Sequence, residues 1–259
     1  MKKTRIGILG GTFNPVHNGH LKAAAIVQKR FSLDRVLFIP SFIPPHKTTA
    51  GVAPASDRLA MVKLAVRGRP RFIASAVETE AGGKSYSILT LNKIKKRYPG
   101  AWIFFILGVD AFLEIKTWRE WKRVLGQCLF IVVTRPGYRL REVVNAVGGE
   151  YRSRFRFVPP AERVRERWFS EPRIFLLPIE AADISSTEVR QRARERRSLK
   201  GWVPGSVEGY IQMRSLYRRK SSSRNTPPAS PAQTGRDDVR GQGGKSKSRR
   251  TWTRREARR

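Results

Sequence analysis

Short apolar runs alternate along this chain with longer segments in which apolar residues recur at helical spacing. The runs predict buried strands at Thr4–Leu9, Arg35–Pro40, Arg71–Val77, Ala101–Leu107, Gln127–Thr134 and Arg173–Pro178. The segments between them predict helices at Gly19–Arg30, Ser56–Val66, Ser87–Tyr98, a stretch holding Trp118 and Trp121, Arg139–Val147, Ser186–Arg197 and Ser206–Tyr217. This alternation favours an α/β fold in which helices cover both faces of a doubly wound parallel sheet.

Three segments interrupt the pattern. Ser41–Ser56 is rich in Pro, Thr and Ser and predicts a long loop, with Ser56 as the N-cap of the next helix. Gly148–Pro172 is charged and irregular, and no element is predicted there. From Arg218 onward Ser, Pro, Gly, Lys and Arg replace aliphatic residues, which predicts a disordered basic tail over residues 218–259. The folded domain is therefore expected to span residues 1–217.

The net charge and the cysteine content indicate which binding partners and which cellular compartment fit this protein. The 259 residues carry a formal net charge of +33, which fits either a basic tail with solvated faces or anionic partners such as nucleotides and nucleic acid. The single cysteine, Cys128, is interpreted as a buried strand residue; it allows no disulfide within the chain and fits a reducing compartment. With no signal-peptide pattern and no membrane-spanning apolar run, a cytoplasmic location is expected.

The segment Gly7–Leu21 combines a strand, a glycine turn and the start of a helix. Gly10 and Gly11 permit the backbone to approach an anion closely, and a helix N-terminus offers free N–H groups and a positive dipole end. His17 and His20 lie three positions apart, so both imidazoles can face one phosphate group. The alternative is that both are structural residues of the turn, but the glycine context favours phosphate binding.

Several motifs spread over the folded part resemble one family. They are GGTFNPVHNGHL at 10–21, IPPHK at 43–47, GKSYSILTL at 83–91, FILGVDAF at 105–112 followed by Trp118, RPGY at 135–138, and ISSTEVR at 184–190. The first and last resemble the signatures of the nucleotidyltransferase superfamily. Together the set resembles the bacterial nicotinate-nucleotide adenylyltransferases.

The resemblance implies a Rossmann-like fold and a reaction of NAD biosynthesis. AMP passes from ATP to nicotinate mononucleotide, which gives deamido-NAD and pyrophosphate without a covalent intermediate. Positioning and charge neutralisation supply most of the catalysis in such a transfer. Mg²⁺ is expected as the cofactor, held mainly by phosphate oxygens and water. Three scattered histidines and one cysteine provide no zinc site.

The resemblance also assigns residues to the donor site. It implies catalytic roles for His17, His20 and Arg190. It implies ATP binding by Gly10, Gly11, Thr12, Phe13, His17, His20, Gly108, Asp110, Ile184, Ser186, Thr187 and Arg190. Two local alternatives remain open: Ser185–Thr187 also fits a helix N-cap, and both roles can hold at once; Asp110, which the family places near the ribose and metal, also fits the N-cap of the next helix.

The acceptor site is assigned on the same resemblance. It implies contacts to nicotinate mononucleotide from His46, Lys47, Tyr86, Ser87, Trp118 and Arg135. Trp118 would stack on the pyridine ring, although a tryptophan at this spacing also fits a core residue. Arg135 could pair with the pyridine carboxylate. The alternative for His46, Lys47 and Arg135 is that they are solvated surface residues.

The chain departs from the family pattern at three points. Asn14 and Leu89 stand where the family usually has Asp, and the basic tail has no counterpart. Asn14 still suits a turn before proline, whereas Leu89 removes a carboxylate and receives no role.

Other functions remain open from the sequence. A sister adenylyltransferase could use nicotinamide mononucleotide or phosphopantetheine, although His17 speaks against the latter. A different class of function is polyanion or nucleic-acid binding through Lys245–Arg259, for which a solvated tail without a partner is the favoured alternative. The oligomeric state is not predicted.

Overall fold

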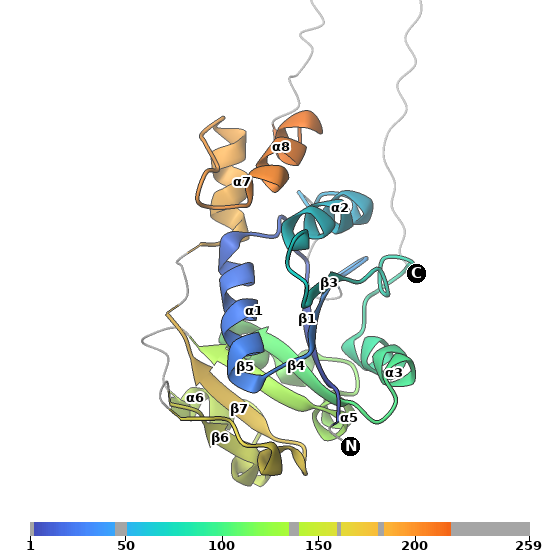
Figure 1. Ribbon diagram of the computed structural model, residues 1–259, viewed down its shortest axis with the longest axis vertical. Helices are drawn as coiled ribbons and strands as arrows, with labels where there is room; N and C mark the ends of the chain where they lie inside the picture. The colour runs from blue at the N-terminus through green and yellow to red at the C-terminus, as the bar shows by residue number, and fades with distance from the viewer. Residues whose placement is uncertain (1–2, 45–50, 135–139, 160–161, 181–183, 219–259) are drawn as a thin grey trace, which may run out of the picture. The chain divides into compact units, whose positions relative to one another are not determined.

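The computed structural model describes residues 3–44, 51–134, 140–159, 162–180 and 184–218 (Figure 1). Its strands are β1 (Arg5–Gly11), β2 (Arg35–Pro40), β3 (Phe72–Ala74), β4 (Trp102–Gly108), β5 (Leu129–Thr134), β6 (Phe155–Phe157) and β7 (Ile174–Pro178). They form one sheet in the order β3-β2-β1-β4-β5-β7-β6, and every neighbouring pair is parallel. The predicted doubly wound parallel sheet is confirmed.

The helices lie between strands along the chain, except for the last two, which follow β7. They are α1 (Asn18–Phe31), α2 (Ala55–Val66), α3 (Ser87–Arg97), α4 (Val109–Leu113), α5 (Trp121–Gln127), α6 (Leu140–Asn145), α7 (Ser186–Arg194) and α8 (Gly205–Met213). Three 3-10 helices, η1 (Ile115–Thr117), η2 (Gly149–Arg154) and η3 (Glu166–Phe169), complete the described elements. None of the helices in the described ranges is long and apolar enough to cross a membrane.

The sheet separates two apolar cores. Successive residues of β4 point to opposite faces, so Phe104 belongs to one core and Phe105 to the other. The first core also takes buried residues from α1, α2, α7 and α8, and the second takes them from α3, α4, α5 and α6. Strands buried on both faces explain why the sequence shows continuous apolar runs rather than alternation.

The structure corrects the predicted strands at three places. Strand β1 continues through Gly10 and Gly11, which were predicted to lie in a turn. The predicted strand Arg71–Val77 pairs only over β3, because the chain turns after Ser75 and Thr79 donates its hydroxyl to the Ala76 carbonyl at 3.0 Å. The irregular segment Gly148–Pro172 contains an unpredicted strand, β6, which pairs with β7. Three residues are too few to show a periodic pattern.

Helix boundaries are also corrected. Helix α2 begins one residue before Ser56, and its N-cap is Pro54 without a side-chain hydrogen bond. The single helical stretch predicted around Trp118 and Trp121 is divided, because Trp118 is extended and Glu120 adopts a left-handed backbone with φ of 55°. Cys128 is buried as predicted but precedes β5 instead of lying within it.

Strand β1 lies inside the sheet, between β2 and β4. A Cβ atom at Gly7 would lie 2.9 Å from the Cδ1 atoms of both Ile106 and Leu33, so a side chain there would require the ends of these two side chains to shift. The carboxyl end of β1 at Gly11 pairs with Pro40 of β2, and Leu9 pairs with Ile106 of β4, so the turn after β1 opens at the middle of one sheet edge.

Candidate active site

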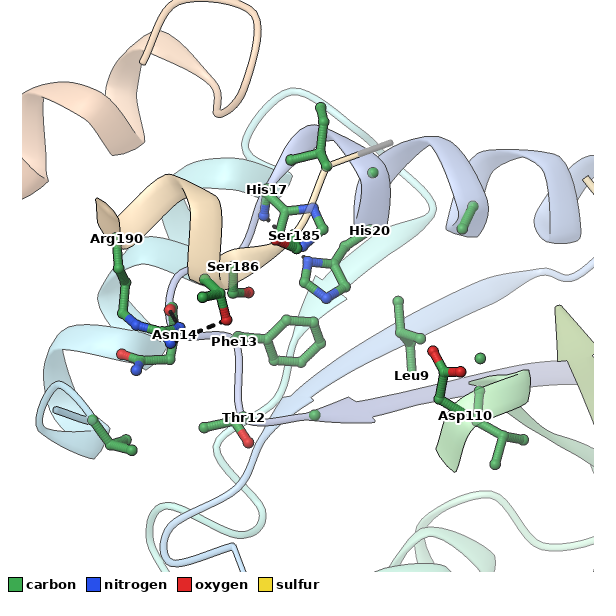
Figure 2. Close-up of a pocket in the computed structure, with 18 of the residues that line it drawn as sticks. Leu9, Thr12, Phe13, Asn14, His17, His20, Asp110, Ser185, Ser186 and Arg190 are labelled. Carbon is green, nitrogen blue, oxygen red and sulfur yellow. Dashed lines mark hydrogen bonds between the residues drawn. The ribbon is translucent and has the colours of Figure 1, made fainter. Parts of the chain in front are cut away.

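A cleft of about 1200 Å³ opens at the carboxyl edge of β1 and β4 (Figure 2). It is lined by these residues of the predicted ATP site: Gly11, Thr12, Phe13, His17, His20, Gly108, Asp110, Ile184, Ser186, Thr187 and Arg190. Gly10 does not line it. A Cβ atom at Gly10 would meet only Phe105 Cζ, at 3.9 Å, so this position does not require glycine. Segments about 170 residues apart therefore line one cavity beside the start of α1 (Figure 2).

The two histidines are stacked at the start of α1. Their ring centroids lie 3.7 Å apart with an interplanar angle of 30°, and the edge of Phe13 packs against His20 at 5.0 Å. The backbone N–H of His17 donates to Nδ1 of His20 at 3.3 Å. Because Nδ1 accepts this bond, a neutral His20 carries its proton on Nε2, which makes Nε2–H the donor left for a ligand.

Burial lowers the pKa of His20 well below its ordinary value, and the neighbouring His17 lowers it further. His20 is therefore neutral at neutral pH when no ligand is bound. A bound polyphosphate would oppose this shift, because negative charge favours the imidazolium.

This shift predicts a pH dependence of stability. Below about pH 6.5, the ordinary pKa of histidine, an unfolded chain binds a proton at His20 that the folded chain does not. The free energy of unfolding should therefore decrease as pH falls from about 7.5 to about 5.5, by up to about 1.4 kcal/mol per pH unit from this group. Urea titrations of the protein and of His20→Asn measure it. An equally steep decrease in the variant would contradict the assignment.

Helix α7 is anchored to the turn that precedes the histidines. The Ser186 hydroxyl donates to the Pro15 carbonyl at 2.9 Å, and Arg190 Nη1 donates to the Asn14 carbonyl at 2.9 Å. Arg190 Nη2 also donates to Thr187 Oγ1 at 3.2 Å. These bonds fix the guanidinium beside the turn, facing the cleft that His17 and His20 line (Figure 2).

The segment 185–187 both caps α7 and contributes to the lining of the cleft. Ser185 is the N-cap of α7, because its Oγ accepts from the Glu188 N–H at 3.2 Å and Glu188 Oε2 accepts from the Ser185 N–H at 3.0 Å. Ser186 and Thr187 do not cap the helix and line the cleft. The N-terminus of α7 therefore faces the cavity beside that of α1.

The hydrogen bonds of Asn14 explain why an amide can stand at this position, where the family usually has Asp. Its Nδ2 donates to the Gly51 carbonyl at 3.1 Å, and its Oδ1 accepts from the Ala53 N–H at 3.0 Å. Both groups of the amide are used, and a carboxylate at this position could not donate to Gly51. The amide ties the turn after β1 to the segment before α2.

Asp110 lies in the first turn of α4 and lines the cleft. The N-cap of α4 is Gly108, so the alternative role of Asp110 as N-cap is wrong. Among the described residues, no group of three or more His, Cys, Asp and Glu side chains could hold a metal ion. One carboxylate in the cleft fits a Mg²⁺ ion that takes its other ligands from phosphate and water.

The predicted acceptor residues that the structure describes, Tyr86, Ser87 and Trp118, are not part of the lining of this cleft. Tyr86 and Trp118 both pack against the second core, and Trp118 meets Phe105 edge to face at 5.6 Å. The guanidinium of Arg119 lies 5.0 Å from the Tyr86 ring centroid. Ser87 begins α3. His46, Lys47 and Arg135 lie outside the described residues.

Sequence reasoning missed several residues of the cleft. Leu9, Asn14, Gly19, Ala23, Gly51, Val52, Ile106, Leu107, Val109, Val133, Ile179, Ser185, Arg194, Tyr217 and Arg218 also line it. Three of them carried a usable signal. Gly19 and Ala23 lie four positions apart, on one side of α1, and their small size leaves room in the cleft. Arg194 likewise follows Arg190 by four positions on α7.

These features define a class of protein. A cleft lined by histidine and arginine at the carboxyl edge of a doubly wound parallel sheet is typical of nucleotide sites. The cytidylyltransferase-like family model matches residues 8–192. Two relatives are each described as a probable nicotinate-nucleotide adenylyltransferase. The one from Citrifermentans bemidjiense is 41% identical over 213 residues (82% of this chain, 98% of the relative). The one from Corynebacterium glutamicum is 39% identical over 227 residues (88% and 94%). The chain belongs to the nicotinate-nucleotide adenylyltransferase family.

Solved structures share the fold at lower identity. Nicotinic acid mononucleotide adenylyltransferase from Plasmodium falciparum, in complex with NaAD, matches with a TM-score of 0.63 and 16% identity over 83% of this chain and 97% of its own. A putative nicotinate-nucleotide adenylyltransferase from Vibrio parahaemolyticus matches with a TM-score of 0.55 and 18% identity over 84% and 97%. At these identities the likeness establishes the fold.

Proposed function

We propose that this protein transfers AMP from ATP to nicotinate mononucleotide and releases pyrophosphate, a step of NAD biosynthesis. A phosphate oxygen of the acceptor attacks the α-phosphorus of ATP in line. The bond from that phosphorus to the oxygen bridging to the β-phosphate breaks, and pyrophosphate leaves. One observation carries the proposal: hydrogen bonds from Ser186 and Arg190 hold α7 against the turn before His17 and His20, so that one cleft collects all four side chains.

The proposed donor roles follow from the groups in this cleft. His20 donates through Nε2–H to the triphosphate, and the N-terminus of α1 adds its dipole. Arg190, already oriented by Asn14, neutralises charge that accumulates on the leaving pyrophosphate. Asp110 would hold Mg²⁺, which when bound withdraws negative charge from the phosphate oxygens.

The proposed acceptor half lies around Tyr86, Ser87 and Trp118. It is supported by the pairing of the segment before Tyr86 with the segment after β2: the Ser85 N–H donates to the Ile43 carbonyl at 3.0 Å. Both segments follow the strands on one side of β1. The roles of His46, Lys47 and Arg135 stay predictions from the resemblance.

The domain division is part of the same proposal. Residues 1–220 form one compact unit, which supports a catalytic domain that ends near Tyr217. Beyond Arg218 the tail lies outside the described residues, so its disorder and its binding to polyanions stay predictions from composition. The cytoplasmic location likewise stays a prediction.

The acceptor assay tests the proposed function directly. The protein is incubated with ATP, Mg²⁺ and one acceptor at a time: nicotinate mononucleotide, nicotinamide mononucleotide or phosphopantetheine. We expect the fastest pyrophosphate release with nicotinate mononucleotide. Release only with phosphopantetheine would assign the chain to the sister activity, and no release with any acceptor would exclude an adenylyltransferase.

A further inference from the structure

Arg58 of α2 is a buried cation at the carboxyl edge of the sheet. Its exposed fraction is 1%, and its guanidinium donates to three main-chain carbonyls: Nε to Ala53 at 2.9 Å, Nη1 to Thr12 at 2.8 Å and Nη2 to Phe42 at 2.9 Å. Within the described residues no carboxylate forms an ion pair with it. The neighbouring Asp57 instead accepts from Tyr210 and Arg214 of the α8 segment.

The three carbonyls belong to two loops. Thr12 lies in the turn after β1 and lines the nucleotide cleft, whereas Phe42 and Ala53 lie near the two ends of the connection between β2 and α2. The Ala53 N–H donates to the Asn14 side chain at 3.0 Å, so this loop is also bonded to the turn after β1. Arg58 therefore links the turn after β1, which lines the donor cleft, to the segment after β2.

That segment continues the connection to the acceptor side. The Phe42 N–H donates to Ser85 Oγ at 2.8 Å, one residue before Tyr86. The chain of contacts runs from Thr12 through Arg58 and Phe42 to Ser85. Both polar groups of the Phe42 backbone are engaged, so Phe42 has little freedom to move relative to either side.

Burial of a guanidinium without an ion-pair partner is costly, and the bonds to the three carbonyls offset part of that cost. The planar fork of arginine aims these donors in fixed directions, which lysine cannot do. An in-line transfer requires the attacking oxygen at a defined distance and angle from the α-phosphorus, and a small misplacement lowers the rate steeply.

We propose that Arg58 is a positioning residue that sets the acceptor side of the site relative to the nucleotide cleft through the carbonyls of Thr12 and Phe42. This inference rests on the proposed function. Arg58 does not line the cleft, and it acts through the backbone of Thr12, which does, and of Phe42, which does not.

Arg58→Lys tests the inference by separating turnover from nucleotide binding. We expect kcat to fall about 100-fold, while the Kd for ATP, measured by calorimetry, stays close to that of the unsubstituted protein. Arg30→Lys is the matched control, because Arg30 Nη2 also donates to two carbonyls, Pro159 at 2.7 Å and Glu162 at 2.9 Å, near the other end of α1. This control should lose stability and keep its kcat.

Ser85→Ala weakens the same connection without disturbing the buried guanidinium, and keeps the inference testable if Arg58→Lys does not fold. It should also lower kcat with little change in the Kd for ATP, and combined with Arg58→Lys it should lower kcat by less than the product of the two effects. An unchanged kcat in Ser85→Ala, or an ATP affinity that falls as much as kcat, would overturn the inference. If the unsubstituted protein releases no pyrophosphate with any acceptor, the proposed function itself fails.

Discussion

His20→Ala should lower kcat/KM for ATP by about 100- to 1000-fold, the loss expected when one preorganised donor to a developing phosphate charge is removed. The reason is the geometry at the start of α1. Nδ1 of His20 is occupied by the His17 N–H, so Nε2–H is its one donor to the nucleotide. Steady-state kinetics at saturating nicotinate mononucleotide measure the effect.

Two further substitutions separate catalysis from helix capping at His20. Asparagine places an acceptor where Nδ1 lies and keeps the bond from the His17 N–H, but it lacks the distal donor. Glutamine places a donor near the position of Nε2 and loses that bond. We expect His20→Asn to be stable but to have low activity. We expect His20→Gln to be less stable than His20→Asn but more active. Near-normal turnover in His20→Ala would show that the stacked pair is structural.

Arg190→Lys should lower kcat/KM for ATP by about 100-fold, although it keeps the positive charge. The guanidinium uses one nitrogen on the Asn14 carbonyl and another on Thr187, and this fork holds the charge at the cleft. A lysine ammonium cannot form both bonds in the same directions. Because Arg190 is proposed to contact the departing pyrophosphate, the affinity for ATP should fall much more than that for AMP.

Arg192→Lys provides the comparison on the same helix. Arg192 donates from Nε and Nη2 to the Ser198 carbonyl at 3.1 Å and 2.9 Å and stacks over Trp202, and it does not line the cleft. Its substitution should leave the affinities for ATP and AMP unchanged. If Arg190→Lys lowered the affinities for ATP and AMP equally, Arg190 would not contact the β- and γ-phosphates.

Local patterns predicted most of the fold and the first half of the donor site. The strand, turn and helix of Gly7–Leu21 are encoded by neighbouring residues, so apolar runs and the spacing of His17 and His20 were sufficient. Where the local signal is weak, prediction failed. Strand β6 has three residues in a charged segment and exists through its pairing with β7, and the left-handed backbone at Glu120 gave no sign in the sequence.

The sequence by itself determined the class of fold, the phosphate turn and, through its motifs, the expected reaction. The tertiary structure decided which distant segments meet: Arg190 reaches Asn14 across 176 positions, and Tyr86 and Trp118 lie apart from the cleft lining. It alone showed the role of Arg58, which in the sequence is an ordinary charged residue of a helix. Its partners are backbone carbonyls, which every residue possesses, so no pattern of side chains could identify them.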